Sequence, residues 1–147
     1  RRRKRSINKN VQKILDQEKF NNLDNFEFCI QFKKNCENSK RKLNILLNKF
    51  IAQKKKIVGY AATSKSTTIL NYCGIDSNTI HYICDTTKEK IGKYSPGMHI
   101  PIVSTSHFNK AKVDYAYLFA WNHKKEIFKK EINFKNRGGK WFSHVEL

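Results

Sequence analysis

The sequence predicts an α/β protein in which helices precede, and then alternate with, the strands of a mostly parallel sheet. The β-branched and aromatic run Ile57–Tyr60 is typical of a buried strand, and the small residues after it lead into a helix that continues through Thr67–Leu70. Two further apolar runs follow, at 80–84 and 113–120. Strands separated by helical or long polar segments favour parallel pairing with right-handed crossovers. We therefore expect a Rossmann-like sheet.

The first part of the chain, residues 1–52, is predicted to consist of amphipathic helices. Its apolar residues recur at spacings of three, four or seven, which is the pattern of a helix with one apolar face. These residues are Val11, Ile14, Leu15, Phe28, Cys29, Phe32, Cys36, Leu43, Leu46, Leu47 and Phe50. The turn-forming segment Asn21–Asn25 separates the first helix from the second. We expect two or three helices as a lead-in over 1–52 and a Rossmann-like domain over 53–147, packed together as one compact unit.

The second half of the chain is predicted to complete the sheet. A long polar loop over 86–97 leads into the apolar run 99–103. A helix is expected over 122–130, and the Gly138-Gly139 pair precedes a closing strand over 140–145. Loops of this length often carry binding residues, so we expect the 86–97 loop to contribute to ligand specificity.

The composition is strongly basic, with a formal net charge of +18 at pH 7 over 147 residues. A charge of this size attracts polyanions non-specifically and in a salt-dependent way. However, the basic residues are 24 Lys and 6 Arg, and the lysines are spread along every segment instead of gathering with aromatic residues in one stripe. A nucleic-acid-associated protein is therefore an alternative that rests on charge alone.

The cysteines and the hydropathy pattern argue against other classes of protein. The four cysteines form no Cys-x-x-Cys pair and no Cys/His cluster with zinc spacing, so we expect free, buried thiols and no metal site. They are Cys29, Cys36, Cys73 and Cys84. No apolar run approaches the roughly 20 residues of a membrane span, and the basic residues 1–5 are not followed by the apolar stretch of a signal peptide. We expect a cytoplasmic protein that does not bind membranes.

The turn after the first predicted strand is a candidate phosphate-binding element. A dinucleotide-binding fingerprint has the form G-x-G-x-x-G, and here its glycine positions hold Gly59, Ala61 and Ser64, so the match is partial. The backbone N–H groups at the start of the following helix would face an anion. Side chains of the same segment are candidate phosphate ligands, with ordinary helix capping as the alternative for the hydroxyls. These candidates are Ser64, Lys65, Ser66 and Thr67.

Four further residues stand where ligands bind in folds of this kind. Asp85 ends the apolar run 80–84, at the place of an acidic residue that binds a ribose hydroxyl, although Asp is also common in turns after strands. Trp121 and Asn122 follow the run 113–120 and would lie either at the binding edge of the sheet or in the core. His99, between a Pro-Gly turn and Ile-Pro, is a candidate pocket residue or a structural loop histidine.

Several blocks of sequence occur together in the order of a known enzyme family. The blocks are Val58–Ser66, Leu70–Ile75, Gly92–Ile102, Trp121-Asn122 with Glu126-Ile127, and Gly138–Lys140. On these blocks the sequence resembles the C-terminal domain of the S-adenosylmethionine-dependent sugar C-methyltransferases. In that family the segment at Lys65 usually reads Ala-Lys-Gly, whereas here it reads Ser-Lys-Ser. A serine in place of the glycine restricts the backbone and adds a hydroxyl.

The resemblance implies that this domain binds a nucleotide-linked keto-sugar. Enzymes of the family also have a small zinc-binding region and a central domain that holds S-adenosylmethionine and the catalytic base. This sequence shows no cysteine quartet for the zinc, no acidic glycine-rich cofactor loop and no His-bearing segment like the one that supplies the base. We therefore expect no catalytic residue and no cofactor in this chain. It would bind substrate without methylating it, unless another polypeptide supplied the missing methyltransferase domain.

A stand-alone nucleotide- or dinucleotide-binding module of Rossmann-like fold is the second interpretation. Such a module would use the same turn after the first strand and the same acidic residue at the end of the second. The incomplete glycine pattern and the ordered blocks of the methyltransferase resemblance argue against it.

Overall fold

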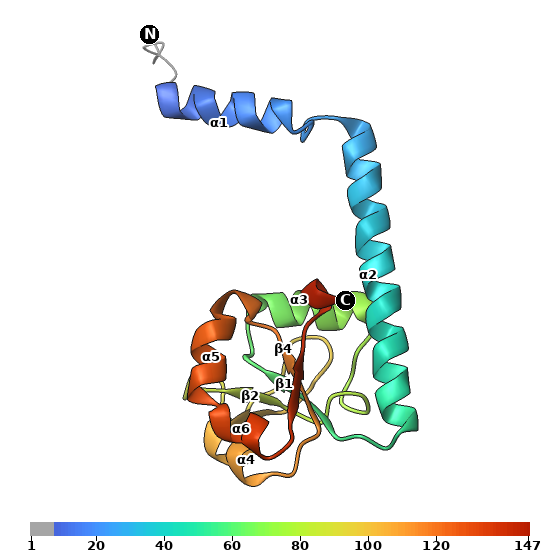
Figure 1. The fold of residues 1–147 in the computed structure, drawn as a ribbon, viewed down its shortest axis with the longest axis vertical. Helices are drawn as coiled ribbons and strands as arrows, with labels where there is room; N and C mark the ends of the chain where they lie inside the picture. Colours follow the sequence, from blue (N-terminus) through green and yellow to red (C-terminus); the bar gives the residue numbers. More distant parts are fainter. Residues whose placement is uncertain (1–7) are drawn as a thin grey trace. The chain divides into compact units, whose positions relative to one another are not determined.

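The structure is a computed structural model that describes residues 8–147, and Figure 1 labels most of its helices and strands. Contacts within the chain define two compact units, one that ends at Asn38 and one that comprises Ser39–Leu147. We refer to the second unit, which contains every strand of the described residues, as the sheet domain.

The predicted helical start of the chain is confirmed as two helices in the described residues. Helix α1 (Lys9–Phe20) is followed by a turn over 21–24, and α2 (Phe26–Ala52) then continues without interruption. The side chain of Asn25 accepts a hydrogen bond from Glu27 N at 2.9 Å and thereby caps the start of α2. The break predicted from Asn and Asp residues therefore lies where expected.

The sheet domain is built on a sheet of five strands in the described residues, and every pair of neighbours is parallel. The strands are β1 (Ile57–Tyr60), β2 (Ile83–Asp85), β3 (Ile102–Ser104), β4 (Tyr115–Leu118) and β5 (Lys140–Phe142). Their order across the sheet is β3-β2-β1-β4-β5. The prediction of an α/β protein with a Rossmann-like, mostly parallel sheet is confirmed.

Short helices connect most of the strands. They are α3 (Ser64–Cys73), α4 (Thr105–Lys110), the 3-10 turn η1 (Trp121–His123), α5 (Lys124–Lys130) and α6 (Ile132–Asn136). Between β2 and β3 the chain instead follows the long loop 86–101. Helices α4 and α6 were not predicted, because each is five or six residues long and has one buried side chain, Phe108 or Phe134, which is too little for a helical period.

One face of the sheet is covered by α3 and by the last part of α2. Because side chains alternate along a strand, Ile57, Ile83 and Tyr117 point to this face. Leu47 of α2 and Leu70 of α3 belong to the same buried cluster. The last part of α2 also brings an aromatic ring onto the sheet, since the rings of Phe50 and Tyr115 stack with centroids 3.7 Å apart.

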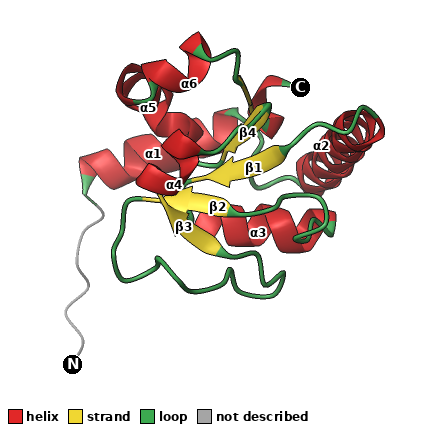
Figure 2. Ribbon diagram, turned by 90° about the horizontal axis from the view of Figure 1, so that it is seen from below, coloured by secondary structure: helices red, strands yellow, loops and turns green. Residues whose placement is uncertain are grey.

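The opposite face is covered by α4, α5 and α6. Val58 and Leu118 point to this side and pack in one cluster with Phe108 of α4 and Phe134 of α6, while Ile127 of α5 packs against it. Figure 2 shows α3 on one side of the strands and α5 and α6 on the other. Both faces of the sheet are therefore buried, as parallel sheets require.

Gly59 lies in the interior of β1, where a side chain has no room. A Cβ atom at this position would be 2.7 Å from the Phe119 ring and 3.1 Å from Ile83 Cγ1. The first glycine of the partial fingerprint therefore allows an aromatic ring to pack on the sheet, which is a structural reason for its presence.

The prediction of buried thiols is wrong for two of the cysteines. Cys73 and Cys84 are buried in the sheet domain, but Cys29 is exposed and Cys36 is half-buried. Both lie in the unit that ends at Asn38, in which α1 has no buried residue. Helical spacing showed that they share a face with Phe32, but not whether that face is covered, and Phe32 is 62% exposed.

The packing of α2 on the sheet predicts a large effect of one truncation. Leu47 is 2% exposed, so Leu47→Ala should lower the free energy of unfolding of the sheet domain by about 2–4 kcal/mol through lost burial and a cavity. Ile45, on the same helix, is 62% exposed, and Ile45→Ala should change this free energy by less than about 0.5 kcal/mol. Urea denaturation followed by circular dichroism measures both, and equal losses would contradict the described packing.

Candidate functional site

The candidate site lies at the carboxyl edge of the sheet, between the ends of β1 and β4. These strands are neighbours, but the chain leaves β1 toward α3 on one face and leaves β4 toward α5 on the other. We call this place the switch point. Open α/β sheets bind ligands in the crevice that forms there.

The turn after β1 is strained at Ala61. Its φ is +74°, in the left-handed region that residues with a side chain rarely adopt. The conformation is held by hydrogen bonds on both sides, since Ala61 N donates to Cys84 O at 2.7 Å and Thr63 N donates to Ala61 O at 3.1 Å. Ala61 occupies the second glycine position of the fingerprint, so the backbone retains a glycine-like shape without the glycine.

Three hydroxyls close the start of α3. Thr63 Oγ1 accepts from Ser66 N at 3.2 Å, and Ser66 Oγ accepts from Thr63 N at 3.0 Å, which together form a capping box. Thr67 Oγ1 donates to Thr63 O at 3.5 Å. Ser66 is buried, whereas Ser64 is exposed. The capping box therefore accounts for Ser66, and the Thr67 hydroxyl is bonded to the backbone of the same turn. The role of Ser66 and Thr67 as phosphate ligands stays a prediction.

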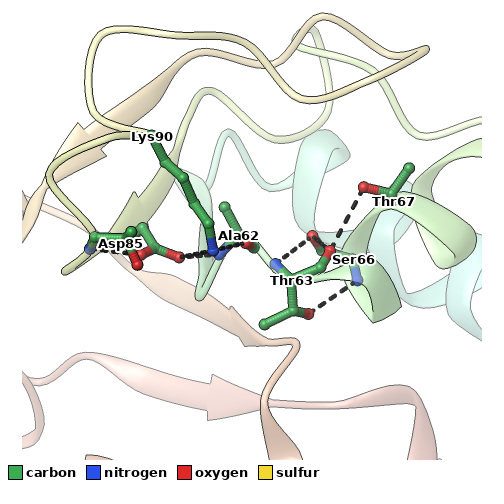
Figure 3. Close-up of polar contacts among 7 residues, drawn as sticks. Ala62, Thr63, Ser66, Thr67, Asp85 and Lys90 are labelled. Atoms are coloured by element: carbon green, nitrogen blue, oxygen red, sulfur yellow. Dashed lines mark hydrogen bonds and ion pairs between the residues drawn. The ribbon is translucent and has the colours of Figure 1, made fainter.

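Asp85 fastens the turn after β1 to the loop after β2. Its carboxylate accepts hydrogen bonds from Ala62 N at 2.7 Å and Thr87 N at 2.8 Å, and Lys90 Nζ lies 3.6 Å away. Lys90 Nζ also donates to Ala62 O at 2.7 Å, so both residues contact the same peptide segment. Figure 3 shows Asp85 and Lys90 meeting at Ala62 beside the capping box. In this structure Asp85 therefore acts as a structural clamp.

The surroundings of Asp85 favour its ionised form. Burial by itself raises the pKa of the carboxyl, but the hydrogen bonds from Thr87 and Ala62 and the charge of Lys90 outweigh it, so the pKa lies below the usual value. The carboxylate is thus ionised at neutral pH, with acceptors engaged by backbone N–H groups.

Three of the predicted site residues meet at the switch point. Lys65 Nζ, from the first turn of α3, donates to Asn122 Oδ1 at 2.8 Å. The same ammonium lies 4.8 Å from the centroid of the Trp121 ring, within the range of a cation–π contact. The sequence motifs named these residues separately, and the fold brings them together.

Two hollows flank the turn after β1. One has a volume of about 320 Å³ and lies between the first turn of α3 and the 90–96 segment; we call it the α3 hollow. Its lining includes Ser64, Lys90, Lys93 and Tyr94. The other, of about 270 Å³, lies on the α5 side and is lined by Asp85, His123 and Lys130 among others. Lys93 and Tyr94 were not named as site residues, although they belong to the long polar loop expected to give specificity.

His99 lies apart from these residues in the fold. It is exposed, precedes the amino end of β3 and has φ +50°, and its N–H donates to Ser95 O at 3.0 Å. The lining of neither hollow includes it. The structure therefore does not bring His99 together with Lys65, and its role as a pocket residue stays a prediction.

Residues 8–147 present neither a metal-binding cluster nor a membrane-spanning helix. No group of three or more His, Cys, Asp or Glu side chains in this range is arranged to hold a metal ion. Within the same range, no helix combines the length and the apolar character that crossing a membrane would require.

The strand order and the residues at the switch point define a Rossmann-like α/β domain with a candidate ligand site at its carboxyl edge. Residues 1–145 match the family described as the C-methyltransferase C-terminal domain, and the chain belongs to this family. The resemblance inferred from the sequence blocks is confirmed.

A relative of known name supports the same assignment. The C-methyltransferase NovU of Streptomyces niveus is 30% identical to this chain over 131 residues. The match covers 89% of this chain and 31% of NovU, so the chain spans about a third of the length of the relative.

The strain at Ala61 predicts a stabilising substitution. Ala61→Gly should raise the free energy of unfolding by about 1 kcal/mol, because glycine adopts φ +74° without the steric penalty of a Cβ atom. Ala62→Gly, at the next residue, is the matched control and should lower stability by roughly 0.5–1 kcal/mol through unfolded-state entropy. A loss of stability in both variants, measured by urea denaturation, would refute the strain.

The clamp formed by Asp85 predicts that the variant Asp85→Asn loses stability in a pH-dependent way. This variant should lower the free energy of unfolding by about 2 kcal/mol near neutral pH, because a charged acceptor of two backbone hydrogen bonds is lost. The folded-state pKa lies below the ordinary value of 3.8, so the stabilisation is complete above 3.8 and disappears as the pH falls through the folded-state pKa. The two proteins should converge in stability at acid pH.

The matched control is Glu89→Gln, an exposed carboxylate in the same loop. It should change stability by less than about 0.5 kcal/mol. Unfolding curves recorded across the acid range test both variants, and a difference between wild type and Asp85→Asn that does not change with pH would contradict the clamp.

Proposed function

We propose that this domain binds the nucleotide-linked sugar substrate of an S-adenosylmethionine-dependent C-methyltransferase. The observation that carries the proposal is the α3 hollow, because it lies beside the switch point and combines a helix start with basic and aromatic side chains. Its volume of about 320 Å³ is at the lower end of the range typical of small-molecule sites.

The start of α3 supplies donors for a diphosphate. Among residues 8–147, the backbone N–H groups of Ser64 and Lys65 form no hydrogen bond with a protein acceptor. Free N–H groups and the helix dipole favour an anion at this position. In our proposal the Ser64 hydroxyl, which is exposed, adds a further donor.

The 90–96 segment supplies charge and an aromatic surface. Lys93 lines the hollow, is exposed and makes no ion pair among residues 8–147, so its ammonium is available to a phosphate. Tyr94 also lines the hollow and is 64% exposed, which leaves its ring open to a nucleobase. Lys90, by contrast, is engaged with Asp85 and Ala62.

The remaining parts of the reaction belong, in this proposal, to other regions of the enzyme. The Asp85 carboxylate, at the position where such folds hold a ribose, is engaged by Ala62 N, Thr87 N and Lys90, so we do not assign it to the ribose of S-adenosylmethionine. We therefore assign the cofactor, the zinc and the catalytic base to the methyltransferase domain, which fits the greater length of NovU. The role of this chain is to hold the substrate so that its reacting carbon is correctly placed.

Four free cysteines favour a cytoplasmic location.

Isothermal titration of the chain with thymidine diphosphate at physiological salt tests the proposal. We expect saturable binding with one ligand per chain, and Lys93→Ala should weaken it by about 1–3 kcal/mol, the range for a lost hydrogen bond to a charged group. Lys88→Ala is the matched control, because Lys88 is an exposed lysine of the same loop that does not line the hollow, and it should leave the affinity unchanged.

Equal losses in Lys93→Ala and Lys88→Ala would show that the lysines act only through general charge. Binding that Lys93→Ala leaves intact would place the nucleotide outside the α3 hollow. No saturable binding by the wild-type chain would count against a nucleotide site within this domain alone.

A further inference from the structure

We propose that Asn122 and Trp121 form a cradle that holds the Lys65 ammonium at the switch point for an anionic group of the ligand. Asn122 is then a positioning residue that acts through Lys65. The inference rests on the proposed function, because it takes the ligand to be a diphosphate compound. It differs from the expectation that Trp121 and Asn122 contact the substrate themselves.

The cradle joins two elements that leave the sheet in opposite directions. Lys65 belongs to α3, which covers one face, and Asn122 belongs to η1, which begins the connection to the other face. Their side chains nevertheless meet, with Lys65 Nζ at 2.8 Å from Asn122 Oδ1 and at 4.8 Å from the Trp121 ring centroid. The ammonium is thus held at the carboxyl edge of the sheet, between the connections that follow β1 and β4, where open α/β sheets bind ligands.

Trp121 is itself held in place by the core. Its ring packs edge-to-face on His144, with centroids 4.8 Å apart and an interplanar angle of 86°. His144 Nδ1 lies 2.9 Å from the Tyr117 hydroxyl, and Tyr117 is fully buried and stacked on Phe142 at 4.9 Å. A chain of contacts therefore runs from the core of the sheet to the ring under Lys65, and the position of the ammonium is preorganised.

The chemistry of the cradle preserves the charge of the lysine. Asn122 is a neutral amide, and among residues 8–147 Lys65 has no carboxylate at ion-pair distance, unlike Lys55, Lys90 and Lys124. An ammonium has three N–H donors, so one bond to Asn122 leaves two for a ligand. The Trp121 ring attracts the cation without accepting a conventional hydrogen bond. The arrangement fixes a positive charge without neutralising it, which suits the binding of an anion.

The experiment that tests the cradle replaces its amide with a carboxylate of the same shape. Asn122→Asp keeps the contact with Lys65 but neutralises the charge of its ammonium. We therefore expect the affinity for thymidine diphosphate and for inorganic pyrophosphate to fall about tenfold in calorimetric titrations. The thermal unfolding midpoint should be unchanged or higher, because a charged pair replaces a neutral contact. A merely structural contact would instead leave the affinity intact.

Four further variants sharpen the test. Lys65→Met should weaken the binding of both ligands as much as Asn122→Asp does. The double variant should show no additional loss of affinity, because both changes remove the same charge. Asn133→Asp adds an equal charge at an exposed position of α6 and should change neither affinity. Asn122→Ala removes the hydrogen bond from Lys65 but leaves the charge of the ammonium, so it should weaken binding less than Asn122→Asp does.

The outcomes separate this inference from the proposed function. If the wild type binds thymidine diphosphate and Asn122→Asp binds it equally well, the cradle is overturned and the proposed function stands. If the wild type binds pyrophosphate with the expected sensitivity but not thymidine diphosphate, the cradle stands and the nucleotide site is overturned. If the wild type binds neither, both are overturned.

Discussion

Burial of both faces of a parallel sheet is the constraint on which the rest of the sheet domain depends. Each inner strand presents alternate side chains to two apolar clusters, one closed by α2 and α3 and the other by α4, α5 and α6. To supply both layers, the chain must leave β1 toward one face and β4 toward the other. The crevice between these two strand ends is therefore a consequence of core formation, and the candidate site occupies it.

The polar contacts at this edge divide into those that hold the backbone and those that can face a ligand. The Asp85 clamp and the capping box at Thr63 engage their own acceptors and donors within the turn. These contacts fix the strained backbone conformation of Ala61, because an unfavourable conformation persists only where several surrounding contacts hold it in place. Lys65 and Lys93, in contrast, retain charges without carboxylate partners in the described residues. A rigid turn beside unneutralised lysines is a suitable arrangement for binding phosphate groups.

At the switch point, part of the large positive charge of the chain is held at a defined position. Most lysines lie on exposed surface and contribute a diffuse attraction for anions. A few are placed by tertiary contacts, as Lys65 is by Asn122 and Trp121. Under our proposal, such placed lysines would hold the anionic part of a nucleotide-linked substrate.

The sequence by itself determined the class of fold, the helical start, the strand β1 and the family, because apolar periodicity and ordered motif blocks are local properties of the chain. It also named Lys65, Asp85, Trp121 and Asn122 as candidate ligand-binding residues, with the core as the alternative place for the last two. Only the tertiary structure determined which other residues they contact. Asp85 meets Ala62 and Lys65 meets Asn122 across 23 and 57 residues of chain, and separations of that kind are set by strand order and packing, which no local pattern encodes. For the same reason, helical spacing placed Cys29 and Phe32 on one face but could not show that this face is exposed.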